Sequence, residues 1–81
     1  MFEKKFNGKN CIVTGGAGFI GSSLVEELIL SGAYVKIIDN LSVGKQNVKL
    51  LTKIGAEIFE SDICNYEEIK NLFNDVDYVF H

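Results

Sequence analysis

Three glycines at intervals of three residues indicate a phosphate-binding turn early in the chain. Gly15, Gly18 and Gly21 lie in residues 14–21, which read TGGAGFIG. The first glycine suits a tight turn, the second lets the backbone approach a ligand, and the third lets a following helix pack closely on the preceding strand. Such a helix would direct its unpaired N–H groups and the positive end of its dipole at the ligand. A pyrophosphate has the charge that this turn would bind.

An acidic residue further along the chain strengthens this interpretation. Asp39 closes an apolar run, residues 34–39. It lies about 20 residues beyond the glycines, the distance at which dinucleotide-binding folds place a carboxylate. A carboxylate at the end of a strand can accept hydrogen bonds from both ribose hydroxyls of an adenosine. The alternative is a glycine-rich connection that binds no ligand.

The apolar pattern predicts the elements that would hold these residues in place. Residues 10–14 and 34–39 are short, apolar and β-branched, as in strands buried on both faces of a parallel sheet. Between them a helix is predicted over residues 19–31, followed by Gly32 as its C-terminal cap. Its apolar residues recur at helical spacing and are Ile20, Leu24, Val25 and Leu28. Together these segments predict a βαβ unit.

The rest of the chain repeats this alternation. A short helix is predicted over residues 46–54, a third strand over 56–61 and a fourth strand over 77–81. Asn65 and Glu68 have the spacing of a capping box, which predicts a third helix that continues to Val76. We therefore expect an α/β fold with a parallel sheet whose faces are both covered. If the strands take the Rossmann-type order 3-2-1-4, the first two helices would cover one face of the sheet and the third helix the other.

Length, composition and charge exclude several classes of protein. The chain has 81 residues, 47% of them hydrophobic and 23% charged, as expected for one domain with a packed core. Its net charge is −3 and its lysines are scattered, so neither a nucleic-acid surface nor a polybasic membrane anchor is indicated. No apolar run approaches the roughly 18 residues of a membrane span, and no signal peptide is recognisable. We expect a soluble, cytoplasmic protein.

The cysteines and the single histidine show no catalytic or metal-binding pattern. Cys11 and Cys64 lie in elements that are not expected to be neighbours, and Cys/His ligand spacing is absent. We expect two buried, reduced thiols and no metal site. His81 is expected to be a buried residue at the end of the fourth strand rather than a catalyst.

Four motifs in this order resemble one enzyme family. They are residues 14–21, residues 39–44 with the sequence DNLSVG, the pair Asp62-Ile63, and residues 78–81 with the sequence YVFH. With them the chain resembles the N-terminal part of the extended short-chain dehydrogenases/reductases, and most closely the NAD-dependent sugar-nucleotide epimerases and dehydratases of the UDP-glucose 4-epimerase type. The resemblance covers essentially the whole chain. It implies that residues 1–81 are a partial NAD-binding Rossmann domain, truncated after the fourth strand.

The resemblance also implies a set of NAD-binding residues, grouped by the part of the cofactor that each would contact. Those for the pyrophosphate would be Gly15, Gly18 and Gly21 with the backbone of Phe19 and Ile20. Those for the adenosine ribose would be Asp39, Asn40, Ser42 and Gly44. Those for the adenine would be Asp62 and Ile63. The carboxylate of Asp39 would repel the 2′-phosphate of NADP, which favours NAD.

The family's catalytic residues would lie beyond the fourth strand. There the resemblance places a catalytic Ser or Thr and a Tyr-x-x-x-Lys pair, so we assign no catalytic residue and expect these 81 residues not to catalyse alone. In the parent enzyme, NAD would take a hydride from a carbon of a nucleotide sugar, leading to epimerisation or dehydration. Tyr66 and Lys70 match Tyr-x-x-x-Lys literally, but their place on the helix after the third strand indicates an exposed surface pair.

Two other functions are compatible with the same sequence. The fold could belong to a non-catalytic, dinucleotide-binding sensor or regulator, or to a folded piece that binds nothing tightly. The apolar fourth strand would present an unpaired edge, and such edges recruit other strands. We therefore also expect a homo-oligomer, formed through the edge of the fourth strand or by an exchange of elements between copies.

Overall fold

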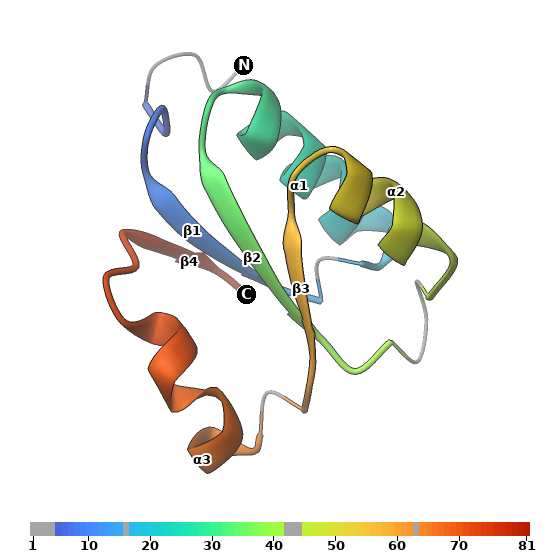
Figure 1. Cartoon of the computed structure of the whole chain (residues 1–81), viewed down its shortest axis with the longest axis vertical. Coiled ribbons are helices and arrows are strands. Elements are labelled where there is room, and N and C mark those ends of the chain that lie inside the picture. The colour runs from blue at the N-terminus through green and yellow to red at the C-terminus, as the bar shows by residue number, and fades with distance from the viewer. Residues whose placement is uncertain (1–4, 16, 42–44, 63) are drawn as a thin grey trace.

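The structure, a computed structural model, describes residues 5–15, 17–41, 45–62 and 64–81 (Figure 1). Its strands form one four-stranded parallel sheet in the order β3-β2-β1-β4, which confirms the predicted topology. They are β1 (Asn10–Thr14), β2 (Tyr34–Asp39), β3 (Glu57–Glu60) and β4 (Tyr78–Phe80). The two β-branched runs are thus the central strands, where side chains on both faces are covered.

Helices make the connections between consecutive strands. The helix α1 (Phe19–Leu30) joins β1 to β2. The 3₁₀ turn η1 (Lys45–Asn47) and the helix α2 (Val48–Lys53) join β2 to β3. The helix α3 (Tyr66–Ile69) and the 3₁₀ turn η2 (Lys70–Phe73) join β3 to β4. The predicted α/β alternation is therefore confirmed.

The third helical segment is shorter than the apolar spacing predicts. The amide Nδ2 of Asn65 donates to Oε2 of Glu68 at 2.9 Å, and no side chain among the described residues caps the first N–H groups of α3. The expected capping box is therefore only a contact between two side chains. After η2 the backbone is extended at Asn74 and left-handed at Asp75, with φ 61°. This change of conformation ends the helix before Val76.

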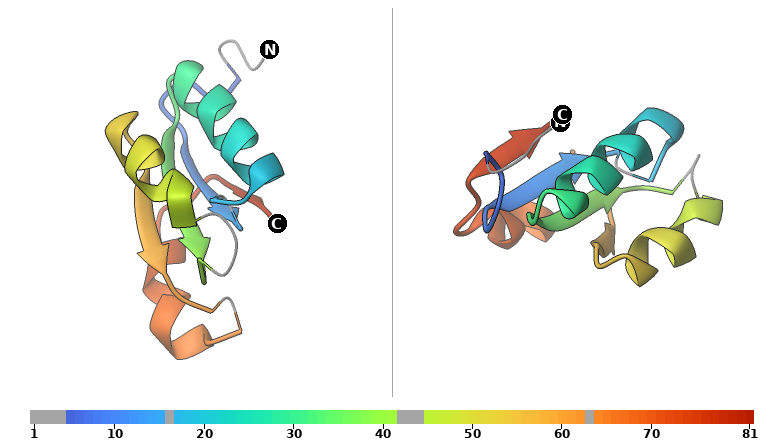
Figure 2. Two further views of the ribbon diagram at one scale, coloured as in Figure 1. Left: turned by 90° about the vertical axis from the view of Figure 1, so that its right-hand side faces the viewer. Right: turned by 90° about the horizontal axis from the view of Figure 1, so that it is seen from above.

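Successive residues of the central strands pack on opposite faces of the sheet. On one face, Cys11 and Val13 of β1 and Val35 and Ile37 of β2 join a cluster that includes side chains from α1 and α2. We call this the α1–α2 face. On the other, Ile12 and Ile38 pack with Ile69 of α3, and we call this the α3 face. Figure 2 shows α1 and α2 next to each other and α3 apart from them. Helices thus cover both faces, as predicted.

The segment before β1 packs on β4. Phe6 is buried, and its ring makes edge-to-face contacts with the rings of Tyr78 and Phe80 at centroid distances of 4.9 and 5.7 Å. At the same end of the sheet, the N–H of Asn10 donates to Oδ2 of Asp77 at 2.8 Å, and the N–H of Asp77 donates to the carbonyl of Asn10 at 2.7 Å. These contacts hold the short β4 against β1.

No helix in the described ranges is long and apolar enough to cross a membrane.

Candidate functional site

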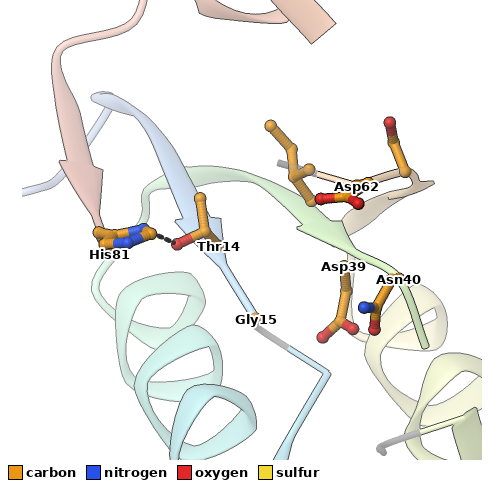
Figure 3. A pocket seen from close by; sticks show the side chains of 8 residues that line it. Thr14, Gly15, Asp39, Asn40, Asp62 and His81 are labelled. Atoms are coloured by element: carbon orange, nitrogen blue, oxygen red, sulfur yellow. Dashed lines mark hydrogen bonds between the residues drawn. The ribbon is translucent and has the colours of Figure 1, made fainter. Parts of the chain in front are cut away.

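A cleft of about 310 Å³ opens at the edge of the sheet where the parallel strands end (Figure 3). Its lining comes from the end of each strand and the residues just after it, and consists of Thr14, Gly15, Ile38, Asp39, Asn40, Ser61, Asp62 and His81. The chain leaves β1 for one face of the sheet and reaches β4 from the other face. In open α/β sheets, ligands bind in the crevice at such a reversal.

The glycine-rich turn begins directly at the end of β1. Gly15 has φ 69°, a left-handed conformation that side chains disfavour, and its N–H donates to the carbonyl of Ile38 at 2.8 Å. The N–H of Gly18 donates back to the carbonyl of Gly15 at 3.2 Å. A Cβ atom on Gly18 would lie 3.5 Å from that carbonyl, an ordinary contact. The chain's own packing therefore permits a side chain at Gly18.

The first turn of α1 carries N–H groups that have no acceptor within the helix. Gly18 is the N-cap, and its carbonyl accepts the first helical hydrogen bond, from the N–H of Ser22 at 2.8 Å. The N–H groups of Phe19, Ile20 and Gly21 therefore precede any helical acceptor. No side chain in the described part of the chain caps them, and the first turn carries no acidic residue. Together with the helix dipole they form a site suited to an anion.

Asp39 holds the turn from the neighbouring strand. Its Oδ2 accepts the N–H of Ala17 at 3.0 Å, and its Oδ1 accepts the N–H of Leu41 at 2.7 Å. Leu41 has φ 60°, so this bond supports a conformation that a leucine disfavours. A carboxylate oxygen can accept more than one hydrogen bond. Asp39 can therefore hold the loop and still accept the hydroxyls of a ribose.

Asn47 also reaches the glycine-rich turn, a contact that sequence reasoning missed. Its Nδ2 donates to the carbonyl of Ala17 at 2.8 Å, across 30 residues of sequence. Asn47 occupies the N-cap position of α2, where an asparagine normally bonds its own helix, but its side chain makes no such cap. Local pattern therefore suggests the usual cap, and only the fold shows the contact with Ala17.

The side chains after β3 border the far part of the cleft. Asp62 is exposed, and its Oδ1 accepts the N–H of Cys64 at 2.9 Å. The hydroxyl oxygen of Ser61 is buried and has no hydrogen-bond partner among the described residues. An orphaned polar group in a cleft wall indicates a partner from outside the chain. Of the remaining predicted cofactor-binding residues, Ser42, Gly44 and Ile63 lie outside the described residues.

The histidine differs from expectation. His81 is exposed rather than buried, and it directly follows β4, which ends at Phe80. There its Nδ1 lies 2.8 Å from the hydroxyl oxygen of Thr14, as Figure 3 shows, and that hydroxyl also lies 3.4 Å from the carbonyl of Phe80. The end of β4 is thus joined to the start of the glycine-rich turn.

The two cysteines differ from each other. Both are free, and Cys11 is buried while Cys64 is exposed, so the expectation of two buried thiols is wrong for Cys64. Cys64 lies in the turn between β3 and α3, outside the core. Burial, and after it the carboxylate of Asp77, raises the pKa of the Cys11 thiol. Within the described ranges, no group of three or more His, Cys, Asp or Glu could hold a metal ion.

The literal Tyr-x-x-x-Lys match lies away from the cleft. Tyr66 is 69% exposed, and Nζ of Lys70 forms an ion pair with Oε2 of Glu67 at 2.8 Å. The residues that line the cleft include neither Tyr66 nor Lys70. Both therefore form the exposed surface pair that their position predicts.

The chain is similar to several known proteins. Residues 11–81 match the family model described as the NAD dependent epimerase/dehydratase family. The chain is 39% identical over 74 residues to UDP-glucuronic acid decarboxylase 1 of Danio rerio. The match covers 90% of this chain and 17% of that protein.

Two solved structures are also similar. UDP-glucose 4-epimerase of Thermotoga maritima, solved with UDP-glucose, has a TM-score of 0.78 and 44% identity, covering 89% of this chain and 23% of that one. The enzyme WbmF of Bordetella bronchiseptica, solved with NAD+, has a TM-score of 0.82 and 38% identity. The match covers 96% of this chain and 24% of that one. The chain thus spans between 17% and 24% of these three proteins.

Proposed function

Because the chain belongs to the NAD-dependent epimerase/dehydratase family, we propose that it is the NAD-binding portion of an enzyme that modifies nucleotide sugars. The observation that carries this proposal is the cleft at the ends of the strands. It brings the glycine-rich turn together with Asp39 and Asp62, from three different strand ends. A phosphate-binding turn and two carboxylates at one sheet edge match the needs of a dinucleotide.

The pyrophosphate would lie against the start of α1. Gly15, Gly18 and Gly21 would leave room for it, and the N–H groups of Phe19 and Ile20 would donate to its oxygens. The structure fits this role in two respects. The donors of the first turn precede any helical acceptor, and the chain's own packing does not demand a glycine at position 18. A ligand that needs close approach to the backbone would explain that glycine.

The adenosine would extend from this turn across β2 toward β3. Asp39 would accept the ribose hydroxyls, with Asn40, Ser42 and Gly44 around them, while Asp62 and Ile63 would contact the adenine. The half-buried carboxylate of Asp39 would lie close to a 2′-phosphate, and repulsion between the two anions favours NAD over NADP. The orphaned hydroxyl of Ser61 lies in the same wall and would gain a polar partner there.

The chemistry of the whole enzyme would be a hydride transfer at a carbon of the sugar, and NAD supplies the hydride acceptor when it is bound. The residues of this chain would bind and orient that cofactor. No catalytic group is proposed among them, and the portion alone is proposed to be inactive. The substrate of the full-length protein would be a nucleotide sugar, by analogy with the UDP-glucose in the Thermotoga maritima epimerase structure. Epimerisation and dehydration are both compatible with this site.

Titration with cofactor fragments tests the proposal. NAD and ADP-ribose should bind with similar affinity, because the proposed contacts involve only the adenosine and the pyrophosphate. NADP should bind at least about tenfold more weakly, a difference of about 1.4 kcal/mol. The measurement is isothermal titration calorimetry, or chemical-shift titration where binding is weak. A preference for NADP would overturn the role given to Asp39, and a chain that binds none of the three would overturn the proposed function.

We also propose that copies of the chain associate through the outer edge of β4. Among the described strands, β4 pairs only with β1, and Tyr78 and Val79 are 37% and 51% exposed. An unpaired apolar edge offers backbone groups to a strand of another copy. Sedimentation at high protein concentration should therefore show dimers or larger species. A monomer at all concentrations would contradict this proposal.

A further inference from the structure

We propose that Asn47 is a positioning residue that holds the phosphate-binding turn in its binding conformation before the ligand arrives. The inference rests on the proposed function of the cleft as a dinucleotide site. The observation behind it is that two side chains form hydrogen bonds with the backbone of one residue, Ala17, which lies between Gly15 and Gly18. Asp39 accepts the N–H of Ala17 at 3.0 Å, and Asn47 donates to its carbonyl at 2.8 Å.

The two hydrogen bonds to Ala17 restrict the backbone of a turn whose glycines would otherwise make it flexible. Glycine has more backbone freedom than any other residue, so a turn of this composition loses much entropy when it is ordered. Ala17 is fully buried in the cluster of the α1–α2 face, and both of its polar backbone groups are bonded to side chains. The cost of ordering is thereby met during folding, and binding gains from a preformed site.

The same bonds decide which donors remain for an anion. The N–H of Ala17 is taken by Asp39, and the N–H of Gly18 by the carbonyl of Gly15. The N–H groups at the start of α1 are then the ones that a pyrophosphate would meet. Asn47 links the glycine-rich turn to the start of α2, so a shift of α2 would move the turn as well.

An amide is the side chain that this position requires. Nδ2 is a donor, which a carbonyl oxygen needs, and the amide carries no charge. An aspartate has the same shape but no donor. It would place a carboxylate against the carbonyl of Ala17 and add a negative charge near the proposed pyrophosphate. Asn47→Asp is therefore a nearly isosteric change that removes the contact.

The test compares Asn47→Asp with Gln46→Glu in the binding of two ligands, adenosine and ADP-ribose. Gln46 is the exposed neighbour in η1, so its change from amide to acid adds the same charge without touching the turn. For Asn47→Asp we expect the affinity for ADP-ribose to fall about tenfold or more and the affinity for adenosine to fall less than about threefold. Gln46→Glu should change both by less than about threefold. NMR titration measures both ligands, even at millimolar affinity.

Each outcome separates this inference from the one on which it rests. An equal loss of affinity for both ligands in Asn47→Asp would show a general structural role and overturn the inference, as would no loss at all. If Asn47→Asp does not fold, Asn47→Ala removes the same bond without adding charge, and the same selective loss for ADP-ribose is expected. A wild-type chain that binds no ADP-ribose would overturn the proposed function itself.

Discussion

Among the residues that the structure describes, the cluster on the α1–α2 face of the sheet contains eleven buried residues, whereas the cluster on the α3 face contains three. The difference follows from the connecting helices. The helix α1 has 12 residues and packs Val25 and Leu28 against the sheet, whereas α3 has four and buries only Ile69. Each face is closed by helices, but most of the buried apolar area, and with it most of the hydrophobic stabilisation, lies on the α1–α2 face.

The two parts of the proposed site divide along the same line. Ala17 and Leu41 are both bonded to Asp39; Ala17 belongs to the cluster of the α1–α2 face, and Leu41 packs against it. Asp62 leads into α3 and is exposed, and its carboxylate accepts a local hydrogen bond, from the N–H of Cys64. We infer that the pyrophosphate and ribose end of the site is rigid and that the adenine end is held more loosely. Three matched pairs of substitutions test this contrast, each with one member on either side.

The largest effect is expected from the loss of a core leucine. Leu28→Ala would leave a cavity in the large cluster, where Leu28 is fully buried, and should lower the free energy of unfolding by about 3 kcal/mol. Leu72 is only half-buried beside the small cluster, so Leu72→Ala should cost about 1 kcal/mol. Urea unfolding followed by circular dichroism measures both. Losses of equal size would show that the two faces support the fold equally.

The second pair concerns the two carboxylates of the site. Asp39→Asn keeps the shape of the side chain but replaces one acceptor oxygen by an NH₂ group, which would oppose the N–H of either Ala17 or Leu41. We expect affinity for NAD to fall about tenfold or more, together with a smaller loss of stability. Asp62→Asn should lower affinity by less than about fivefold and leave stability unchanged, because this side chain is exposed.

Calorimetric titration with NAD and urea unfolding of both variants check this second prediction. A further expectation sharpens it. Asp39→Asn removes the charge that would repel a 2′-phosphate, so its discrimination against NADP should shrink, whereas Asp62→Asn should discriminate as the wild type does. A larger loss of NAD affinity in Asp62→Asn than in Asp39→Asn would reverse the proposed contrast between the two ends of the site.

What the sequence predicts well is what depends on local pattern. The bounds of β1, α1 and β2 follow from apolar period and from glycines, and the observed α1 ends one residue before the predicted end at residue 31. The alternation of strands and helices predicts the parallel sheet, and the order 3-2-1-4 is the one expected of a Rossmann-type fold. The resemblance to the family implies that Asp39 and Asp62 contact the same cofactor, and both line the cleft.

What it misses depends on contacts between distant segments. The hydrogen bond that Asn47 donates to Ala17 spans 30 residues, and the one that Asp39 accepts from Ala17 spans 22. No local pattern distinguishes such an asparagine from a helix cap. The contact between His81 and Thr14 likewise joins residues 67 positions apart. Long-range pairing of this kind becomes visible only once the sheet is assembled.

The smallest effect is a pH dependence that distinguishes the two thiols. Burial and the nearby Asp77 raise the pKa of Cys11 above its ordinary value of 9.0 in the folded chain. Ionisation therefore favours the unfolded state. The stabilisation is complete below the ordinary pKa and is lost as pH rises through the folded pKa, at a rate that cannot exceed about 1.4 kcal/mol per pH unit for one proton.

Cys11→Ala removes this contribution, so its free energy of unfolding should fall less steeply than that of the wild type between about pH 8 and pH 10. Cys64→Ala is the matched control. Cys64 is exposed in the turn that leads into α3, so this variant should keep the wild-type slope. The quantity to compare is the slope, since loss of the buried sulfur also lowers stability at every pH. Parallel slopes for all three proteins would mean that Cys11 ionises as easily in the fold as outside it, and that the α1–α2 face is less well shielded from water at β1 than its packing implies.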